Sequence, residues 1–267
     1  MADRYASLKQ GLVGAWCPSI SGQGNVLPDL VGGNHGTLTN MDASDWVSSG
    51  DGRAMDFDGV NDQVTAGAVN SFSFIQNTHV WTCSTWIKLS STASASQIIG
   101  NTPFDSADKG FALFYETGRG LGNGVIRAGV TRASGVSANT YQFRSPDNSI
   151  SSTGWHHVCA GMSGQGLPFI FINGVSQAIT VLASDTTLST GDSSRTLGMG
   201  YSPYTSILIP LNGQLDDVRI YNRALSESEI RLLASKRGIG LQNPRDELLF
   251  HQFPSGSSRR LLLTGQT

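Results

Sequence analysis

Apolar and polar side chains alternate in short runs along this chain, and the alternation predicts β-strands. Because successive side chains of a strand point to opposite faces, residues 79–89 place Trp81, Ile87 and Leu89 on one face. That face suits a hydrophobic core between two sheets. The opposite face, which carries Trp86, is more polar.

Eleven runs of this kind follow one another, and Gly, Asn, Asp, Ser or Pro separates most of them. They span residues 11–17, 53–59, 79–89, 96–101, 110–116, 124–131, 140–144, 155–162, 167–174, 194–200 and 213–221. No segment between them has the periodicity of the helices that connect parallel strands. The pattern therefore predicts an all-β fold, an antiparallel sandwich of two sheets.

One short helix is predicted near the C-terminal end of the pattern. Ser226 is suited to be its N-cap, and Glu229 stands at the third helical position, which together form a capping box. Ile230, Leu233 and Ala234 then make one apolar stripe. We expect this stripe to pack against the sandwich.

The periodic pattern ends near Lys236. Residues 236–267 contain apolar clusters and paired arginines but no clear period, so we expect an extended tail that serves for attachment. The predicted organisation is an N-terminal arm over 1–10, one domain over 11–235 and the tail over 236–267.

Composition agrees with a turn-rich β protein and excludes several classes. The chain has 32 glycines and only 14% charged residues. A net charge of −2 argues against a nucleic-acid partner, and no apolar run is long enough to cross a membrane. The N-terminus has no apolar stretch typical of a signal peptide. Cys17, Cys83 and Cys159 have neither disulfide nor zinc-site spacing, so we expect a reducing compartment.

Seven phrases, in order, resemble the laminin-G-like branch of the concanavalin A-like lectin/glucanase superfamily. They are GLVGAW (11–16), GGNHGTLTN (32–40), RAMDFDGVNDQV (53–64), TCSTWIKL (82–89), GWHHV (154–158), FINGV (171–175) and GQLDDVRIYNRALSESEI (213–230). The resemblance implies a two-sheet jelly roll of about a dozen strands. The opening is also similar to phage and prophage proteins, in which the jelly roll is a virion surface or tail-associated part.

The glucanase relatives hydrolyse sugars with two glutamates on one strand. Retaining hydrolysis needs two carboxyl groups about 5–5.5 Å apart. The glutamates of this chain are Glu116, Glu227, Glu229 and Glu247, and no two of them share a predicted strand. We therefore expect no enzymatic activity and no catalytic residue.

Alternation along residues 213–221 puts Asp216 on the same face as Val218 and Ile220, so its carboxylate would point inward. A buried carboxylate needs donors or a cation. The resemblance implies a structural Ca²⁺ held by Asp216 and by the N-terminal segment, where Asp29 is the side-chain candidate and Gly32 or Asn34 offers a backbone oxygen. The alternative is that Asp216 accepts backbone N–H bonds without a metal.

Two functions are compatible with these observations. The first is a non-enzymatic phage virion or decoration protein, a homo-oligomer attached by its tail to capsid or other virion proteins, made without a signal peptide in the host cytoplasm. The alternative is a carbohydrate-binding module that recognises cell-surface glycans. Its candidate ligand-binding residues are the aromatics predicted to be exposed, Trp86, Tyr115, Tyr141, Tyr201 and Tyr204.

Overall fold

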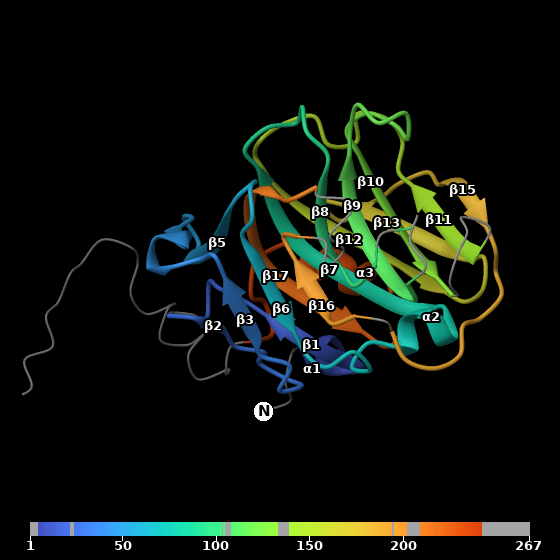
Figure 1. The fold of residues 1–267 in the computed structure, drawn as a ribbon, viewed down its shortest axis with the longest axis horizontal. Helices are drawn as coiled ribbons and strands as arrows, with labels where there is room; N and C mark the ends of the chain where they lie inside the picture. Colours follow the sequence, from blue (N-terminus) through green and yellow to red (C-terminus); the bar gives the residue numbers. More distant parts are fainter. Residues whose placement is uncertain are drawn as a thin grey trace, which may run out of the picture.

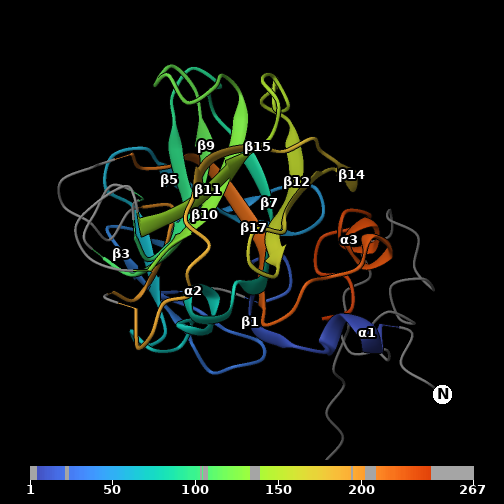
Figure 2. The same ribbon diagram turned by 90° about the vertical axis from the view of Figure 1, so that its right-hand side faces the viewer.

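The computed structural model describes residues 5–21, 24–102, 104, 108–132, 139–193, 195–201 and 209–241. In this part of the chain, nearly all regular structure is β-strand, and the strands form two antiparallel sheets packed face to face (Figures 1 and 2). The predicted two-sheet antiparallel sandwich is confirmed.

The first sheet has eight strands among the described residues, in the order β14-β13-β12-β7-β17-β5-β4, with β1 also paired to β17. The bounds are β1 Leu12–Trp16, β4 Trp46–Ser48, β5 Arg53–Asp58, β7 Val80–Leu89, β12 Trp155–Ser163, β13 Pro168–Ile172, β14 Val175–Ser176 and β17 Asn212–Tyr221.

The second sheet has nine described strands, in the order β15-β11-β10-β9-β8-β16-β6-β3-β2. The bounds are β2 Val26–Leu27, β3 Gly36–Thr39, β6 Gln63–Ala66, β8 Ser96–Gly100, β9 Gly110–Glu116, β10 Val125–Thr131, β11 Thr140–Arg144, β15 Thr180–Ser184 and β16 Leu197–Met199.

Each of the eleven predicted runs contains a strand of the structure, whereas β2, β3, β4, β6, β14 and β15 were not predicted. These strands are two to five residues long, too short for a clear alternation. The predicted helix is α3, Glu227–Leu233, and its capping box is present because Ser226 N donates to Glu229 Oε2 at 2.9 Å.

Three further short helices were not predicted, α1 Ala6–Lys9, α2 Phe74–Thr78 and the 3-10 helix η1 Ala43–Asp45. None of the helices in the described segments has the length and apolar character needed to cross a membrane.

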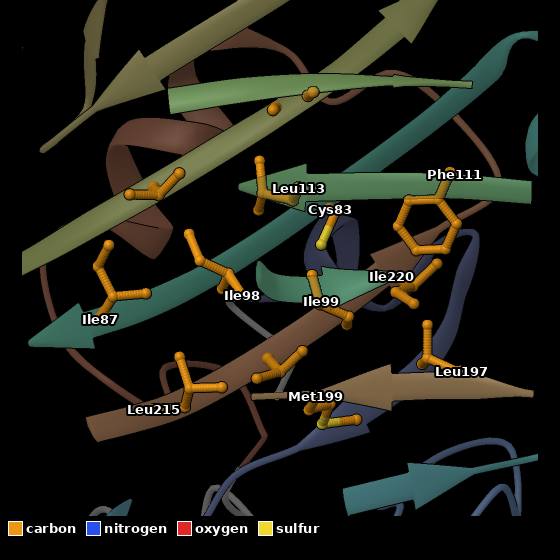
Figure 3. Packing of buried hydrophobic residues seen from close by; sticks show 14 of the residues in the cluster. Cys83, Ile87, Ile98, Ile99, Phe111, Leu113, Leu197, Met199, Leu215 and Ile220 are labelled. Carbon is orange, nitrogen blue, oxygen red and sulfur yellow. The ribbon is translucent and has the colours of Figure 1, made fainter. Parts of the chain in front are cut away.

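The main hydrophobic core lies between the two sheets. Side chains of β7 and β17, such as Ile87 and Leu215, face those of β8, β9 and β16, such as Ile99, Leu113 and Met199 (Figure 3). The predicted core face of residues 79–89 is confirmed, because Trp81, Cys83, Ile87 and Leu89 all belong to this core.

A second apolar cluster covers the outer face of the eight-stranded sheet. Leu8 of α1, Leu233 of α3 and Ile239 pack there with Tyr221 of β17. Residues 5–10 and 236–241 therefore belong to the packed unit, which extends beyond the predicted domain limits of 11 and 235. Residues 1–4 and 242–267, including most of the predicted tail, lie outside the described residues.

Strand β17 contains a bulge that the sequence pattern did not predict. Leu215 pairs with Ile87 and Arg219 pairs with Ser84, so the register shifts between Asp216 and Arg219. Asp217 has a φ of 49°, in the left-handed region. Because of the bulge, Leu215, Val218 and Ile220 all face the core, although 215 is an odd position and 218 and 220 are even positions.

Candidate functional site

The outer face of the nine-stranded sheet, turned away from the other sheet, carries a row of polar side chains. Alternation on β10 and β11 places Ile126, Ala128 and Phe143 in the core, so their polar neighbours face outward. On β8, Gln97 pairs directly with Phe114 of β9, which in turn pairs with Arg127 of β10. We call Gln97, Glu116, Arg127 and Gln142 the outer-face cluster.

Arg127 is the centre of this cluster. Its Nε donates to Glu116 Oε1 at 3.0 Å, and its Nη1 donates to Gln142 Oε1 at 2.9 Å. The guanidinium also lies over the rings of Phe104 and Phe114, 4.9 Å and 4.7 Å from their centroids. The ion pair and the cation–π contacts thus hold the guanidinium of Arg127 against an aromatic surface.

Several buried polar atoms on this face have no hydrogen-bond partner in the structure. They are both amide atoms of Gln97, Oε2 of Glu116, Oγ1 of Thr131 and Nε of Arg144, which lies directly opposite Arg127 on β11. Gln97, Glu116 and Thr131 are each 0% exposed. A buried polar group left without a partner costs about 1–3 kcal/mol, so such groups are rare unless they have a role. Buried polar atoms without partners also occur elsewhere, on His79 and Tyr221 for example, but on this face several of them lie beside one charged centre, Arg127. The outer-face cluster is therefore the candidate binding site.

The predicted sugar-binding aromatics do not form this site. Tyr115 is 0% exposed and Tyr141 is 4% exposed, and both belong to the core between the sheets. The prediction that they are exposed is wrong. Segments such as 110–116 are apolar on both faces, so alternation could not show which face is buried.

Trp86 and Tyr201 are half-buried, and Tyr204 lies outside the described residues. Trp86 points to the outer face of the eight-stranded sheet, where its Nε1 donates to the carbonyl oxygen of Leu233 in α3 at 3.4 Å. The more polar face of residues 79–89 is thus covered by α3, and Trp86 packs edge-on against His157.

The predicted calcium ligands are divided between two places. Both oxygens of Asp29 already accept backbone N–H groups, while Asp216 Oδ2 faces Arg237 Nη1 at 3.5 Å. The four donors to Asp29, at 2.8 to 3.1 Å, are the N–H groups of Ala15, Val31, Gly32 and Asn34. Carboxylates that face N–H groups and a guanidinium do not fit a shared calcium ion. In the parts of the chain that the structure describes, no group of three or more His, Cys, Asp or Glu could hold a metal.

Chelation tests the calcium prediction directly. Because N–H donors satisfy Asp29 and Arg237 lies beside Asp216, we expect EDTA to leave the melting temperature unchanged, measured against a sample with added CaCl₂. A drop of several degrees on chelation, reversed by calcium, would show that a metal stabilises the fold after all.

Asp216 does bind the N-terminal segment, but it does not point into the core between the sheets. Its Oδ1 accepts from Ser19 N at 3.2 Å, on the side of β17 where the terminal segments pack. Burial, and then the charge of Asp217, raise the pKa of Asp216 to about 6. The predicted shared face with Val218 and Ile220 is wrong because the bulge interrupts the alternation.

Asp217 makes the stronger contacts of the two acids. It forms a two-point ion pair with Arg219, Nε–Oδ1 2.7 Å and Nη2–Oδ2 2.9 Å, and accepts from Gly238 N at 2.7 Å. Arg219 also donates to the carbonyl oxygen of Ile239 at 2.8 Å. This arrangement fastens the C-terminal segment to β17 and has a structural role.

One further contact resembles a catalytic pair. Ser84 Oγ and His157 Nε2 lie 2.8 Å apart, as a nucleophile and its base would. However, His157 is 0% exposed and its Nδ1 has no partner to orient the ring. Burial lowers the pKa of His157 to about 3, so the ring stays neutral. We assign this pair to packing.

Sequence reasoning missed the outer-face cluster. The sequence pattern shows Glu116 as a single carboxylate on its strand, and it does not distinguish Gln97 or Gln142 from other polar residues. The available signal was Arg127, a charged residue inside the apolar run 124–131. Its hydrogen-bond partners come from two other strands, β9 and β11, and their positions depend on a register that one sequence does not reveal.

An open pocket of about 550 Å³ lies elsewhere, between the turn after β1 and the start of β5. Its lining includes Pro18, Ser19, Ser21, Pro28 and Arg53. The outer-face cluster remains the stronger candidate because it has several buried polar atoms without partners.

Comparison with known proteins places the fold. The family model of the concanavalin A-like lectin/glucanases superfamily matches residues 58–231. No curated protein matches the chain. Domain 4 of AbnA, a GH43 extracellular arabinanase from Geobacillus stearothermophilus solved with arabinotriose, superposes with a TM-score of 0.60 at 18% identity, over 84% of this chain and 98% of that domain.

Two larger proteins contain a similar unit. Trypanosoma rangeli sialidase with sialic acid gives a TM-score of 0.57 at 19% identity, and the botulinum neurotoxin serotype D binding domain gives 0.57 at 16%. Both matches cover 84% of this chain, but only 32% of the sialidase and 51% of the toxin domain. At such identities the likeness establishes a common fold.

Proposed function

The chain belongs to the concanavalin A-like lectin/glucanases superfamily, and from that premise we propose that it is a non-catalytic, carbohydrate-binding jelly roll. Its binding site is the outer-face cluster. The observation that carries the proposal is the set of buried polar atoms without partners on Gln97 and Glu116. Sugar hydroxyl groups donate and accept hydrogen bonds, so they satisfy such atoms.

The surroundings of these atoms suit a sugar ring. Phe114 lies between Gln97 and Arg127 in the ladder, and a saccharide presents an apolar C–H face to an aromatic ring. Phe104 now packs on Phe114, with 5.4 Å between ring centroids. A sugar that stacks on Phe114 therefore displaces Phe104. Arabinotriose in the similar arabinanase domain supports this class of ligand.

The absence of catalysis is part of the proposal. Glycoside hydrolysis by either common route requires two carboxyl groups across the scissile bond. Among the described strands of the nine-stranded sheet, Glu116 is the one acidic residue, and Arg127 and Arg119 pair with its Oε1. A single paired carboxylate cannot supply both an acid and a nucleophile or base.

A panel of oligosaccharides tests the proposal, with arabinotriose included. We expect calorimetric titration to detect binding of at least one of them, and we expect no release of reducing sugar from the corresponding polysaccharides. The proposal fails if nothing in a broad panel binds. Sugar release that Glu116→Gln abolishes would show that the protein is an enzyme.

Display on a phage particle is a second candidate, expected from the resemblance of the opening sequence. One structural observation favours it. Tyr5 and Leu241, near the two ends of the described chain, pack on the same apolar cluster, on the side of α1 and α3 away from β10 and β11 (Figure 2). An assembly that holds either end leaves the outer-face cluster free.

The particle proposal includes capsid or other virion proteins as partners, a homo-oligomeric arrangement and attachment through the tail. Its test is co-sedimentation of the protein with purified particles in a density gradient. Recovery only at the top of the gradient, with free protein, would contradict it.

A further inference from the structure

We propose that the outer-face cluster selects neutral, hydroxyl-rich saccharides and rejects sugars that carry a carboxylate, such as uronic and sialic acids. The inference rests on the proposed carbohydrate-binding function and specifies its ligand class.

The positive charges around Glu116 lie on one side of its carboxylate. Arg127 Nε lies 3.0 Å from Glu116 Oε1, and Arg119 Nη1 lies 3.7 Å from the same oxygen. Oε2 is left without any partner, although Glu116 is 0% exposed. The carboxylate thus presents an acceptor with negative charge to a ligand, while both cations lie at its other oxygen.

The atoms of this site that lack partners include both donors and acceptors. Glu116 Oε2 and Gln97 Oε1 accept, while Gln97 Nε2 and Arg144 Nε donate. A ligand that satisfies them needs donors as well as acceptors, which hydroxyl groups provide. An ionised carboxylate has only acceptors, so it satisfies none of the acceptor atoms.

The cations near Glu116 each have an anionic partner. Arg127 binds Glu116 and Gln142. Arg144, directly opposite Arg127 on β11, donates through Nη1 to Asp147 Oδ1 at 2.8 Å, so the charge of Asp147 offsets its own although its Nε has no partner. Arg119 is 36% exposed, so water and salt weaken its attraction for an anion. An incoming carboxylate would meet Oε2 inside a buried site, where like charges repel more strongly than in water.

The test compares matched ligands on the intact protein at pH 7. The tightest neutral oligosaccharide from the panel is titrated beside the same oligosaccharide with one hydroxymethyl group oxidised to a carboxylate. We expect the acid to bind about tenfold more weakly or worse. Its methyl ester, which has similar size but no charge, should recover most of the lost affinity.

The variant Glu116→Gln separates charge from shape. It removes the negative charge and leaves Arg127 without its anion, so the ratio between acid and neutral affinities should fall to about threefold or less, or reverse. If this variant does not fold, the ester comparison on the wild type decides alone.

Each outcome has one meaning. Equal binding of acid and neutral sugar overturns the inference, as does an acidic sugar as the tightest ligand of the panel or an ester that binds no better than the acid. Failure of every saccharide, neutral and acidic alike, would instead refute the proposed function on which the inference rests.

Discussion

Replacing Asp217 by Ala is expected to lower the free energy of unfolding by about 3–5 kcal/mol, measured by urea denaturation. The side chains of Asp217 and Arg219 are 2% and 1% exposed, so removing the carboxylate leaves a buried guanidinium without its counter-charge. Gly238 N also loses its acceptor. In addition, Ala is less tolerant than Asp of the left-handed conformation at this position.

An exposed ion pair is the matched control. Glu227 and Arg231 pair on α3 with side chains 53% and 66% exposed. Glu227→Ala should therefore change stability by less than about 0.5 kcal/mol. The double variant Asp217→Ala/Arg219→Leu should recover part of the loss, because the unpaired charge is gone. Similar small effects of Asp217→Ala and Glu227→Ala would contradict the role given to the buried pair.

Truncation after Lys236 is expected to destabilise the fold by several kcal/mol, whereas truncation after Leu241 should leave a cooperatively melting domain. The difference is five residues. Arg237 donates to Ser49 Oγ at 2.8 Å and stacks 4.4 Å from the ring centroid of Trp155. Ile239 fills the second apolar cluster, and its carbonyl oxygen accepts from Arg219. Their loss uncovers buried ionic groups and apolar surface together.

Melting temperatures of the two truncated proteins measure this difference. For a chain of this size, each kcal/mol corresponds to about 2–4 °C, so a separation of about 10 °C is expected. If the two proteins melt together, residues 237–241 contribute little, and the fold ends at the limit that the sequence pattern predicted.

The strands and α3 could be predicted because their signals are local. Alternation showed the core face of β7, and Ser226 with Glu229 marked the start of the helix. The side of Asp216 could not be predicted, because one extra residue in a strand reverses the alternation beyond it. The two adjacent acids in the sequence do not show that β17 has a bulge at this point.

The candidate site was hidden for a related reason. Gln97 lies next to a second register shift, between Gln97 and Ile99 in β8. Whether its amide faces outward, and what lies opposite, depends on pairing with β9, which is not encoded near Gln97. Tyr115 shows the same limit, because both faces of β9 are apolar enough to be buried.

The most direct test of carbohydrate binding at the outer-face cluster is the effect of Gln97→Ala on affinity for the tightest oligosaccharide of the panel. Gln177→Ala is the control, since Gln177 lies just after β14, at the edge of the other sheet, and its Nε2 already donates to the carbonyl oxygen of Val175. We expect Gln97→Ala to weaken binding about tenfold and Gln177→Ala to leave it unchanged. Equal affinities of both variants and the wild type would contradict the assignment of the site.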